Sequence, residues 1–406
     1  MKMPAVMAAL DPDRFFRARQ RSDGDPFVVW MPGLGDVVFT GHPDGARDMF
    51  RAPVDTLAPP LPNPIAPLVG DASLILLGGP RHKRERGLLM PAFHRARLQE
   101  YAEIIAAATA ARLRDWHPGV VVDSRAAAAD ITMQVILEAV FGVHDAARRA
   151  AYTRVITDFL GAYSAPLMLA PVLRRGPGPW ASFVRRRAAF DRLLDAELLR
   201  DTDGTSILSL LRSARYEDGS TITQADLRDE LRTLLVAGHE TTATALCWAL
   251  FHVAATPPPA DAGPRYWEAV AKETLRLHPT VPIVLRRLLE PLDVRDRPVP
   301  AGGVVGVSLH LLHRHPDTWD APAQFRPERF LERKYTPFEY APFGGGYRRC
   351  IGFGLAELEL QVALQTIHAT VRLERLDQRE PVAVPRGIAA SPRNPIRFRV
   401  THRRQT

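Results

Sequence analysis

The segment Phe343-Gly344-Gly345-Gly346-Tyr347-Arg348-Arg349-Cys350-Ile351-Gly352 decides how the rest of this 406-residue chain is interpreted. Its glycines allow the backbone to take unusual torsions and to approach another group closely. Cys350 falls just before a predicted helix, where free amides and the helix dipole favour a thiolate. A thiolate held by amide donors is a good ligand for haem iron, and Arg348 could neutralise a haem propionate. A buried free cysteine after a loop would fit the same spacing.

A second segment, Ala237-Gly238-His239-Glu240-Thr241-Thr242, lies in the middle of a helix predicted over Thr223–Thr256. At about 1.5 Å per residue this helix is about 50 Å long, and its apolar middle implies burial. Glutamate and threonine are costly there unless paired, and the glycine costs about 1 kcal/mol relative to alanine. Such local violations side by side indicate a functional site. A solvated patch, or a threonine bonded back to the helix carbonyl, is the alternative.

Together the two segments resemble the cytochrome P450 superfamily, in its soluble bacterial type. The first matches the pattern Phe-x-x-Gly-x-Arg-x-Cys-x-Gly and the second matches Ala-Gly-x-Asp/Glu-Thr. The resemblance implies haem b (iron protoporphyrin IX) as cofactor, Cys350 as ligand of the iron, and O2 as co-substrate. It implies that Glu240 and Thr241 relay protons to bound dioxygen, and that Gly238 leaves room for oxygen beside the haem. The implied cofactor-binding residues of the first segment are Phe343, Gly346, Arg348, Cys350 and Gly352.

Two further motifs imply a structural network. Glu273 and Arg276 stand three residues apart, so they share a helix face, and Pro327-Glu328-Arg329-Phe330 follows later in the chain. Such pairs are common on surface helices, so the spacing alone is weak evidence for a buried network. By the resemblance, Glu273, Arg276 and Arg329 form a buried ion network that places the cysteine loop and adds little net stability.

Basic residues elsewhere match positions that contact the haem propionates. His82 and Arg86 fit the His-x-x-x-Arg of bacterial members, although a solvated basic helix start has the same composition. Arg286 matches a strand arginine that binds the other propionate. Arg287 beside it leaves that choice open.

The order of elements predicts a mainly α fold with a minor β portion, organised as one domain over residues 1–406. No internal repeat is visible. Only 16 residues separate Thr256 from Glu273, where the family normally has a further helix, so about twenty residues are missing there. The sequence predicts a hairpin of Phe27–Met31 with Asp36–Thr40, and helices over Asp11–Gln20, Arg97–Trp116, Asp123–Phe141, Asp145–Phe159, Trp180–Arg200, Thr223–Thr256, Tyr266–Leu277 and Leu355–Thr370.

Two stretches without charged residues, Thr56–Gly70 and Phe159–Leu173, predict the wall of an apolar pocket. The alternative is that they only pack against neighbouring helices. A lipophilic substrate follows from the first interpretation: a terpenoid, a fatty acyl chain or another secondary metabolite. By the resemblance the rest of the wall comprises the loop near Ala389–Pro395 and Ala237, Val281, Ile283 and Val284.

Composition excludes several classes of protein. Apolar residues make up 46% and charged residues 24%, as in an ordinary globular protein. The net charge of +8 comes almost entirely from arginine, but the arginines are scattered, which argues against nucleic-acid binding. No apolar run is long enough for a membrane anchor, and Met3–Leu10 is too weak for a secretory signal, so we expect a cytoplasmic location.

The remaining cysteine and histidines are not predicted to be ligands. Two cysteines cannot form a disulfide framework or a four-cysteine metal site, so Cys247 is expected in the core. His239 is also expected to be a core residue. His313 and His315 lie beside Pro316 and are expected to be solvated.

The chain shows no flavin or iron–sulfur module, so electrons must come from a separate partner. The resemblance implies a ferredoxin or flavodoxin with its reductase, with NAD(P)H used only indirectly, and a monomeric protein. Arg84, Arg95, Arg97 and Arg349 are candidate docking charges for such an acidic partner. Two alternatives stay open: a peroxide-driven haem-thiolate hydroxylase, which typically lacks the acid–alcohol pair, and a haem-based protein that binds a ligand without oxidising it.

Overall fold

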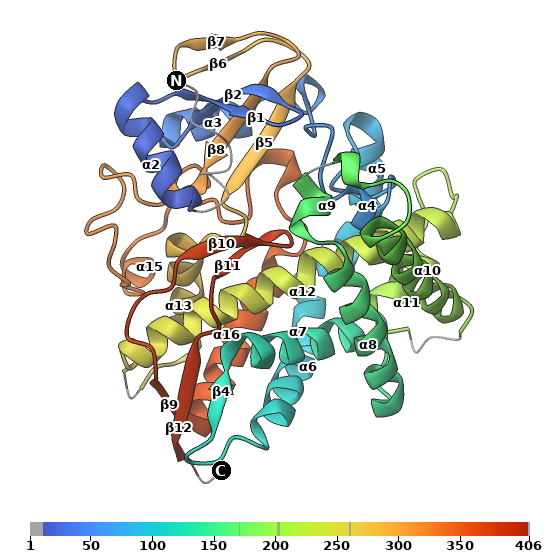
Figure 1. The fold of residues 1–406 in the computed structure, drawn as a ribbon, viewed down its shortest axis with the longest axis vertical. Helices are drawn as coiled ribbons and strands as arrows, with labels where there is room; N and C mark the ends of the chain where they lie inside the picture. Colours follow the sequence, from blue (N-terminus) through green and yellow to red (C-terminus); the bar gives the residue numbers. More distant parts are fainter. Residues whose placement is uncertain (1–10, 170, 201–203, 260, 405–406) are drawn as a thin grey trace.

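The computed structural model describes residues 11–169, 171–200, 204–259 and 261–404. Helices make up most of it, and a sheet built largely from the N-terminal segment and residues 283–308 lies at one end (Figure 1). The predicted mainly α class with a minor β portion is therefore confirmed. The α-helices are α2 Pro12–Asp23, α3 Pro43–Arg51, α4 Ala66–Val69, α5 Gly79–Leu89, α6 Arg95–Leu113, α7 Ser124–Ala139, α8 Ala146–Ala162, α9 Ala165–Leu169, α10 Pro179–Leu198, α11 Ile207–Ser213, α12 Gln224–Ala255, α13 Pro264–Leu277, α14 Leu309–Leu312, α15 Arg329–Glu332 and α16 Phe353–Thr370.

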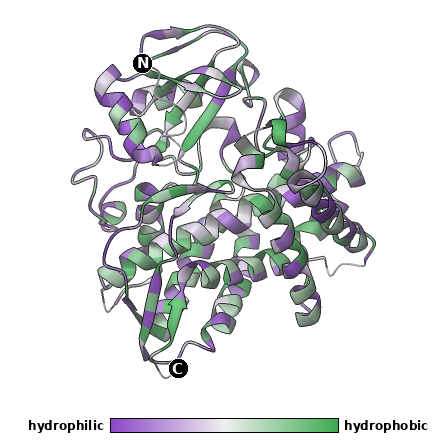
Figure 2. Ribbon diagram, in the orientation of Figure 1, coloured by the Kyte–Doolittle hydropathy of each residue, from purple (hydrophilic) through white to green (hydrophobic). Residues whose placement is uncertain are grey.

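Helix α12 crosses the whole helical part and organises its core. The Thr223 side chain caps its start by accepting a hydrogen bond from the Asp226 amide at 3.1 Å, and three prolines follow its end. It packs against α7, α13 and α16, and every residue from Thr242 to His252 is buried. Figure 2 shows hydrophobic residues gathered where these helices cross, whereas α10 is largely hydrophilic. Among the described helices, α12 alone has the length and apolar character of a membrane span, and most of that stretch is buried inside the protein.

A five-stranded sheet with the strand order β1-β2-β8-β5-β3 lies at the other end of the molecule. The turn Pro32–Gly35 joins β1 and β2 in the antiparallel register Phe27↔Phe39, as the sequence predicts. The strands of this sheet are β1 Phe27–Met31, β2 Gly35–Thr40, β8 Val304–Ser308, β5 Ile283–Leu288 and β3 Leu57–Ala58.

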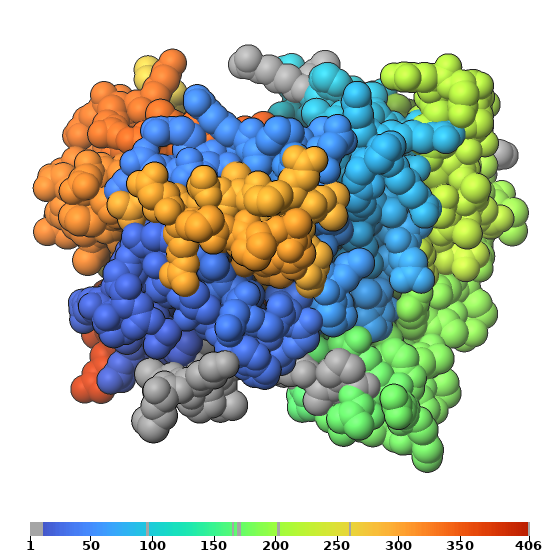
Figure 3. All heavy atoms as spheres, turned by 90° about the horizontal axis from the view of Figure 1, so that it is seen from above, coloured from blue at the N-terminus to red at the C-terminus, as the bar shows by residue number. Residues whose placement is uncertain are grey.

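Three smaller β elements complete the fold. The hairpin of β10 (Ala383–Arg386) and β11 (Ala389–Pro392) lies against α12. The hairpin of β6 (Leu292–Val294) and β7 (Arg297–Val299) packs on α3 and covers the N-terminal segment in Figure 3. Strands β4 (Val121–Asp123), β12 (Arg397–Arg403) and β9 (Val371–Arg375) form the third sheet.

The predicted helices all exist, and their ends differ by a few residues. The largest differences are three residues: α6 ends at Leu113 and not at Trp116, α2 continues to Asp23, and α8 continues to Ala162. No described residue between Thr256 and Gly263 is helical, in agreement with the shortened segment. The weak N-terminal apolar run, Met3–Leu10, lies outside the described residues.

Candidate active site

The cysteine loop is shaped by close contact with α3. Gly344 and Gly346 take left-handed torsions, with φ of +69° and +65°. A Cβ on Gly345 would lie 2.3 Å from the ring of Phe50, so only glycine allows this approach. The loop then turns back, the Cys350 amide donates to the Phe343 carbonyl at 2.9 Å, and α16 begins three residues later.

Cys350 therefore stands where the sequence predicts a thiolate, just ahead of a helix. Its side chain is accessible to solvent, although protein atoms surround the sulfur on most sides. Burial raises the pKa of the Cys350 thiol, whereas the Gly352 amide and the guanidinium groups of Arg86 and Arg349 lower it. A cation bound to the sulfur would favour the thiolate.

Three guanidinium groups and an imidazole gather near the cysteine loop. Burial and the charges of Arg348, Arg86 and Arg286 lower the pKa of His82 to about 3. Burial and Arg348 lower the pKa of Arg286 to about 10. No carboxylate of the described residues pairs with any of the three arginines, and His82 Nδ1 is buried without a hydrogen-bond partner there.

Buried positive charges without an anion are costly, so this arrangement indicates a negatively charged ligand. The two propionates of haem, next to a cysteine that can ligate its iron, fit the cluster. His82 is buried, so the alternative of a solvated helix start is wrong for this residue.

The neighbouring arginines of β5 have different surroundings. Arg286 is buried and donates to the Gly345 carbonyl at 3.4 Å, which links it to the cysteine loop. Arg287 donates to the carbonyls of Gly302 and Leu61, at 2.8 and 3.0 Å. The structure therefore brings Arg286, and not Arg287, next to Arg348.

The Arg348 guanidinium donates hydrogen bonds to backbone carbonyls of the segment before α5. It donates to the backbone of Leu77 at 2.6 Å and of Ile75 at 2.7 Å. These bonds hold the segment before α5 against the cysteine loop. Burial lowers the pKa of Arg348, in keeping with a cation that lacks a carboxylate partner.

Residues of the α12 motif form hydrogen bonds and packing contacts, both within the helix and with α7. The Thr241 hydroxyl donates to the Ala237 carbonyl at 2.6 Å, one turn earlier. A Cβ on Gly238 would lie 2.8 Å from Ile136 of α7, so this glycine lets the two helices pack closely. His239 bonds Thr132 of α7 at 2.7 Å and is buried, which agrees with its predicted place in the core.

Glu240 contacts the turn of the β10–β11 hairpin. Its Oε2 accepts a hydrogen bond from the Ile388 amide at 3.2 Å. Gly387 has φ of +53°, and a Cβ there would lie 2.1 Å from Glu240 Oε2. Burial raises the pKa of Glu240, while the Ile388 amide and the charge of Arg386 lower it.

The sequence interpretation missed these two hairpin residues. A glycine between two short strands signals a turn. Nothing in the local pattern shows that the turn lies against Glu240, almost 150 residues earlier in the chain.

The structure brings Glu273, Arg276 and Arg329 together in a fully buried network. Arg276 donates to both carboxylate oxygens of Glu273, at 2.7 and 2.8 Å, and Arg329 donates to one of them at 3.1 Å. The remaining donors of Arg276 reach the carbonyls of His313 and Pro322, each at 2.8 Å. The network therefore fixes the loop that follows α14.

The residues predicted to line the substrate pocket do not all share one face. Val284 and Arg286 point to the same side of β5, since alternate residues of a strand do. Val284 also lies next to Gly344, 3.8 Å from its Cβ position. Ile283 packs against the phenylalanine cluster of β1, β2 and α2, so its placement in the same wall is corrected. Ala237 is partly exposed and Val281 is 40% exposed.

One histidine and the second cysteine complete the comparison. His313 is fully buried and its Nε2 accepts from the Ala341 amide at 3.0 Å, so the expectation that it is solvated is wrong. His315 is only partly exposed. Cys247 is buried, as expected, and burial raises the pKa of its thiol to about 12.

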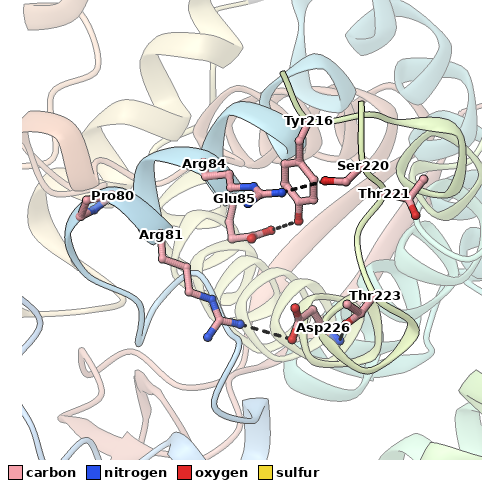
Figure 4. A pocket seen from close by; sticks show the side chains of 9 residues that line it. All are labelled: Pro80, Arg81, Arg84, Glu85, Tyr216, Ser220, Thr221, Thr223 and Asp226. Carbon is pink, nitrogen blue, oxygen red and sulfur yellow. Dashed lines mark hydrogen bonds and ion pairs between the residues drawn. The ribbon is translucent and has the colours of Figure 1, made fainter. Parts of the chain in front are cut away.

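A hollow of about 610 Å³ lies between α5 and the start of α12 (Figure 4). Its polar groups are satisfied by one another: Arg84 donates to Asp218 and Ser220 at 3.1 and 2.8 Å, and the Tyr216 hydroxyl donates to Glu85 at 2.7 Å. Arg81 pairs with Asp226 across it. His82 and Arg86, one turn apart, belong to the opposite helix face.

The fold and the cysteine site define the class of this protein. The sequence model of the family Cytochrome P450 matches residues 8–260 and 265–399, which is nearly the whole chain. The chain therefore belongs to the cytochrome P450 family of haem-thiolate monooxygenases. The interruption of the match falls in the shortened segment before α13.

Relatives from mycobacteria are similar over most of their length. "Putative cytochrome P450 135A1" of Mycobacterium tuberculosis is 35% identical over 374 residues, covering 87% of this chain and 82% of that protein. "Putative cytochrome P450 135B1" of Mycobacterium bovis is 36% identical over 382 residues, covering 89% and 81%.

Solved structures share the fold. Cyanobacterial CYP120A1, with retinoic acid bound, has a TM-score of 0.82 at 23% identity, and 96% of this chain and 94% of that chain are covered. CYP175A1 from Thermus thermophilus has a TM-score of 0.80 at 23% identity, with 97% and 96% covered.

Proposed function

We propose that this protein inserts one oxygen atom of O2 into a lipophilic small molecule, a terpenoid, a fatty acid or another secondary metabolite. The observation that carries the proposal is the partly exposed Glu240–Thr241 pair in the middle of α12. Haem, when bound, supplies the oxygen chemistry that side chains cannot perform. The partly exposed apolar residues Ala237, Val281 and Val284 favour an uncharged substrate.

The residues near the cysteine loop would hold the cofactor. Cys350 would ligate the iron, and the buried Arg286 and the partly buried Arg348, with Arg86 and His82, would bind the propionates. Each of these groups lacks an anionic partner among the described residues, which is the basis for this assignment.

Glu240 and Thr241 would move protons toward the bound oxygen. The Thr241 hydroxyl donates to a backbone carbonyl, so its oxygen keeps lone pairs that can accept a further hydrogen bond. Glu240 is partly exposed and burial raises its pKa, so its carboxyl group can exchange protons with solvent more readily than an ordinary carboxylate.

Variants of this pair test the proposal. With ferredoxin, its reductase and NADPH, Glu240→Gln and Thr241→Ala should keep consuming NADPH but release hydrogen peroxide in place of oxidised product. Thr242→Ala, the adjacent threonine, is the matched control and should couple normally. If both variants couple as well as the unmodified enzyme, the proton-relay role is refuted.

The peroxide-driven alternative is tested in the same assay. Turnover supported by hydrogen peroxide as well as by the reductase system would favour that alternative over the monooxygenase. Bound ligand without any oxidised product would favour a ligand-binding protein. A visible-absorption titration against lipophilic compounds identifies the substrate class first.

We further propose a ferredoxin or flavodoxin as electron donor, with docking at the surface near the cysteine loop. Arg349 is exposed and stacks on Phe353 at 3.8 Å, and it has no ion pair among the described residues. Arg84 and Arg97 already pair with Asp218 and Glu100, which reduces their charge available for docking. The side chain of Arg95 is not described.

Charge reversal at Arg349 tests this docking site. Arg349→Glu should slow reduction most at low salt, because screening weakens an exposed charge contact. Arg97→Glu should have a smaller effect. Unchanged reduction in a variant that combines both substitutions would refute docking at this surface.

We propose that the enzyme acts as a monomer in the cytoplasm. Size-exclusion chromatography tests the oligomeric state, and cell fractionation tests the location.

A further inference from the structure

Two histidines and an aspartate from distant parts of the chain meet at the surface. His42 directly precedes α3, while His315 and Asp317 lie in the loop after α14. One ligand atom from each residue lies within 4.8 Å of the others. Two imidazoles and a carboxylate are a donor set that borderline divalent metals such as Zn²⁺ prefer.

The two imidazole rings meet edge to face, with their centroids 4.5 Å apart. His315 Nδ1 is buried and has no hydrogen-bond partner among the described residues. It lies 3.9 Å from Asp317 Oδ2, which is too long for a hydrogen bond. A buried ring nitrogen without a partner is uncommon, and its lone pair is available to a ligand.

The carboxylates near this cluster differ in their partners. Asp25 pairs with Arg295 at 3.2 Å, and Asp44 pairs with Arg47 at 2.7 Å. Asp317 has no arginine or lysine partner among the described residues, and its side chain is 82% exposed. It is therefore the carboxylate that is free to bind a cation.

Asp44 lies next to the His42 imidazole and can fix its orientation. In the structure its Nδ1 accepts the Asp44 amide at 3.0 Å and so caps α3. The Asp44 carboxylate lies 3.4 Å from the same nitrogen. If Nε2 binds a metal, its proton moves to Nδ1, which then no longer accepts the Asp44 amide and donates to this carboxylate instead. A carboxylate behind a ligating histidine is the usual arrangement at metal sites.

We propose that His42, His315 and Asp317 bind one divalent transition-metal ion, with water completing its coordination and Asp44 orienting His42. Ligand atoms around a tetrahedral Zn²⁺ are about 3.3 Å apart. The present separations must therefore shorten, and the exposed Asp317 side chain can rotate to do so. The exposed side leaves room for water.

Such an ion would join α3 to the loop that follows α14. Helix α3 carries Phe50, which packs on Gly345 and Gly346. The loop of His315 continues to Pro322, whose carbonyl accepts from Arg276. A bound metal would therefore tie the helix that packs on the cysteine loop to the loop that the Glu273 network holds. The proposal does not depend on the proposed oxidation chemistry.

The test uses the haem-loaded protein, in which haem occupies Cys350, after removal of metals with EDTA. Isothermal titration with ZnCl2 should show one ion bound per chain. Asp317→Asn and His315→Ala should weaken this binding at least tenfold, and Asp44→Asn should weaken it about 10–100-fold. The Asp317 side chain is exposed and has no arginine or lysine partner among the described residues, so its variant should fold like the unmodified protein.

The matched control is His117→Ala, which removes an exposed histidine that lies outside any such cluster. It should leave Zn²⁺ binding unchanged. The proposal is overturned if the unmodified protein binds no Zn²⁺ below millimolar concentration. It is equally overturned if Asp317→Asn and His315→Ala both bind Zn²⁺ as tightly as the unmodified protein. Neither result bears on the oxidation chemistry, which the coupling assay measures.

Discussion

Gly387→Ala should displace the Glu240 carboxylate although no residue of α12 is substituted. The new Cβ would lie 2.1 Å from Glu240 Oε2 and 2.5 Å from Oε1, closer than any real carbon contact. The carboxylate must therefore move by about 1 Å to reach ordinary contact distance, and the Ile388 amide loses its acceptor. The φ of +53° adds about 1–2 kcal/mol of strain for a residue with a Cβ. Losing the hydrogen bond adds about 1 kcal/mol, so we expect a loss of about 2–3 kcal/mol of stability.

The assay has two readouts and a matched control. Gly302→Ala also places a Cβ at a positive φ, +81°, but nothing lies within 4 Å of it. Urea unfolding should show about 1–2 kcal/mol of loss for Gly302→Ala, from strain alone. Product formed per NADPH consumed should fall only for Gly387→Ala. If the two variants lose equal stability and couple equally well, the hairpin does not position Glu240.

Three further predictions follow from buried charge. Glu273→Gln should cost about 3–5 kcal/mol in urea unfolding, because it leaves two buried guanidinium groups without their carboxylate; a loss below 1 kcal/mol would contradict a buried network. Arg286→Met should increase the rate of haem transfer to apomyoglobin at least tenfold, with Arg287→Met as control, and equal rates would remove Arg286 from the propionate site. Burial lowers the pKa of His252 to about 3, whereas the unfolded state keeps the ordinary value of 6.5. As the pH drops from 6.5 toward 3, the unfolded state therefore binds a proton that the folded state does not bind, and the free energy of unfolding should fall. His252→Phe should flatten this fall in urea midpoints measured between pH 7.5 and pH 5, and an unchanged slope would contradict the assignment.

The parts of the site that sequence predicts are those encoded locally. The spacing of glycines around Cys350 matters because it shapes one loop, and Thr241 bonds a carbonyl only one helical turn away. The ends of α12 are also local, since Thr223 caps one end and prolines follow the other. Periodicity, capping and turn chemistry are all properties of neighbouring residues.

The parts that sequence did not predict depend on packing between distant segments. His313 lies beside a proline in a stretch that looks like a surface loop, yet the buried Glu273 network pulls that loop inward through Arg276. Ile283 is apolar like Val284, and only the pairing of β5 with β8 decides which of them faces the cysteine loop. The contact of Glu240 with Gly387 likewise exists only once the hairpin docks on α12.

The arginine cluster shows why burial adds information that composition lacks. The chain has 53 basic residues, so finding three arginines at plausible positions carries little weight. Arg286 and Arg348 become informative because Arg286 is buried, Arg348 is partly buried, and neither pairs with a carboxylate of the described residues. A fold that desolvates like charges together is stable only if an anion offsets them, so haem should stabilise the protein as well as activate it. The apoprotein should accordingly unfold at a lower urea concentration than the holoprotein. Replacing Arg286 by a neutral residue should reduce the difference between the two urea midpoints. It should stabilise the apoprotein by relieving charge repulsion, and it should destabilise the holoprotein by weakening haem binding.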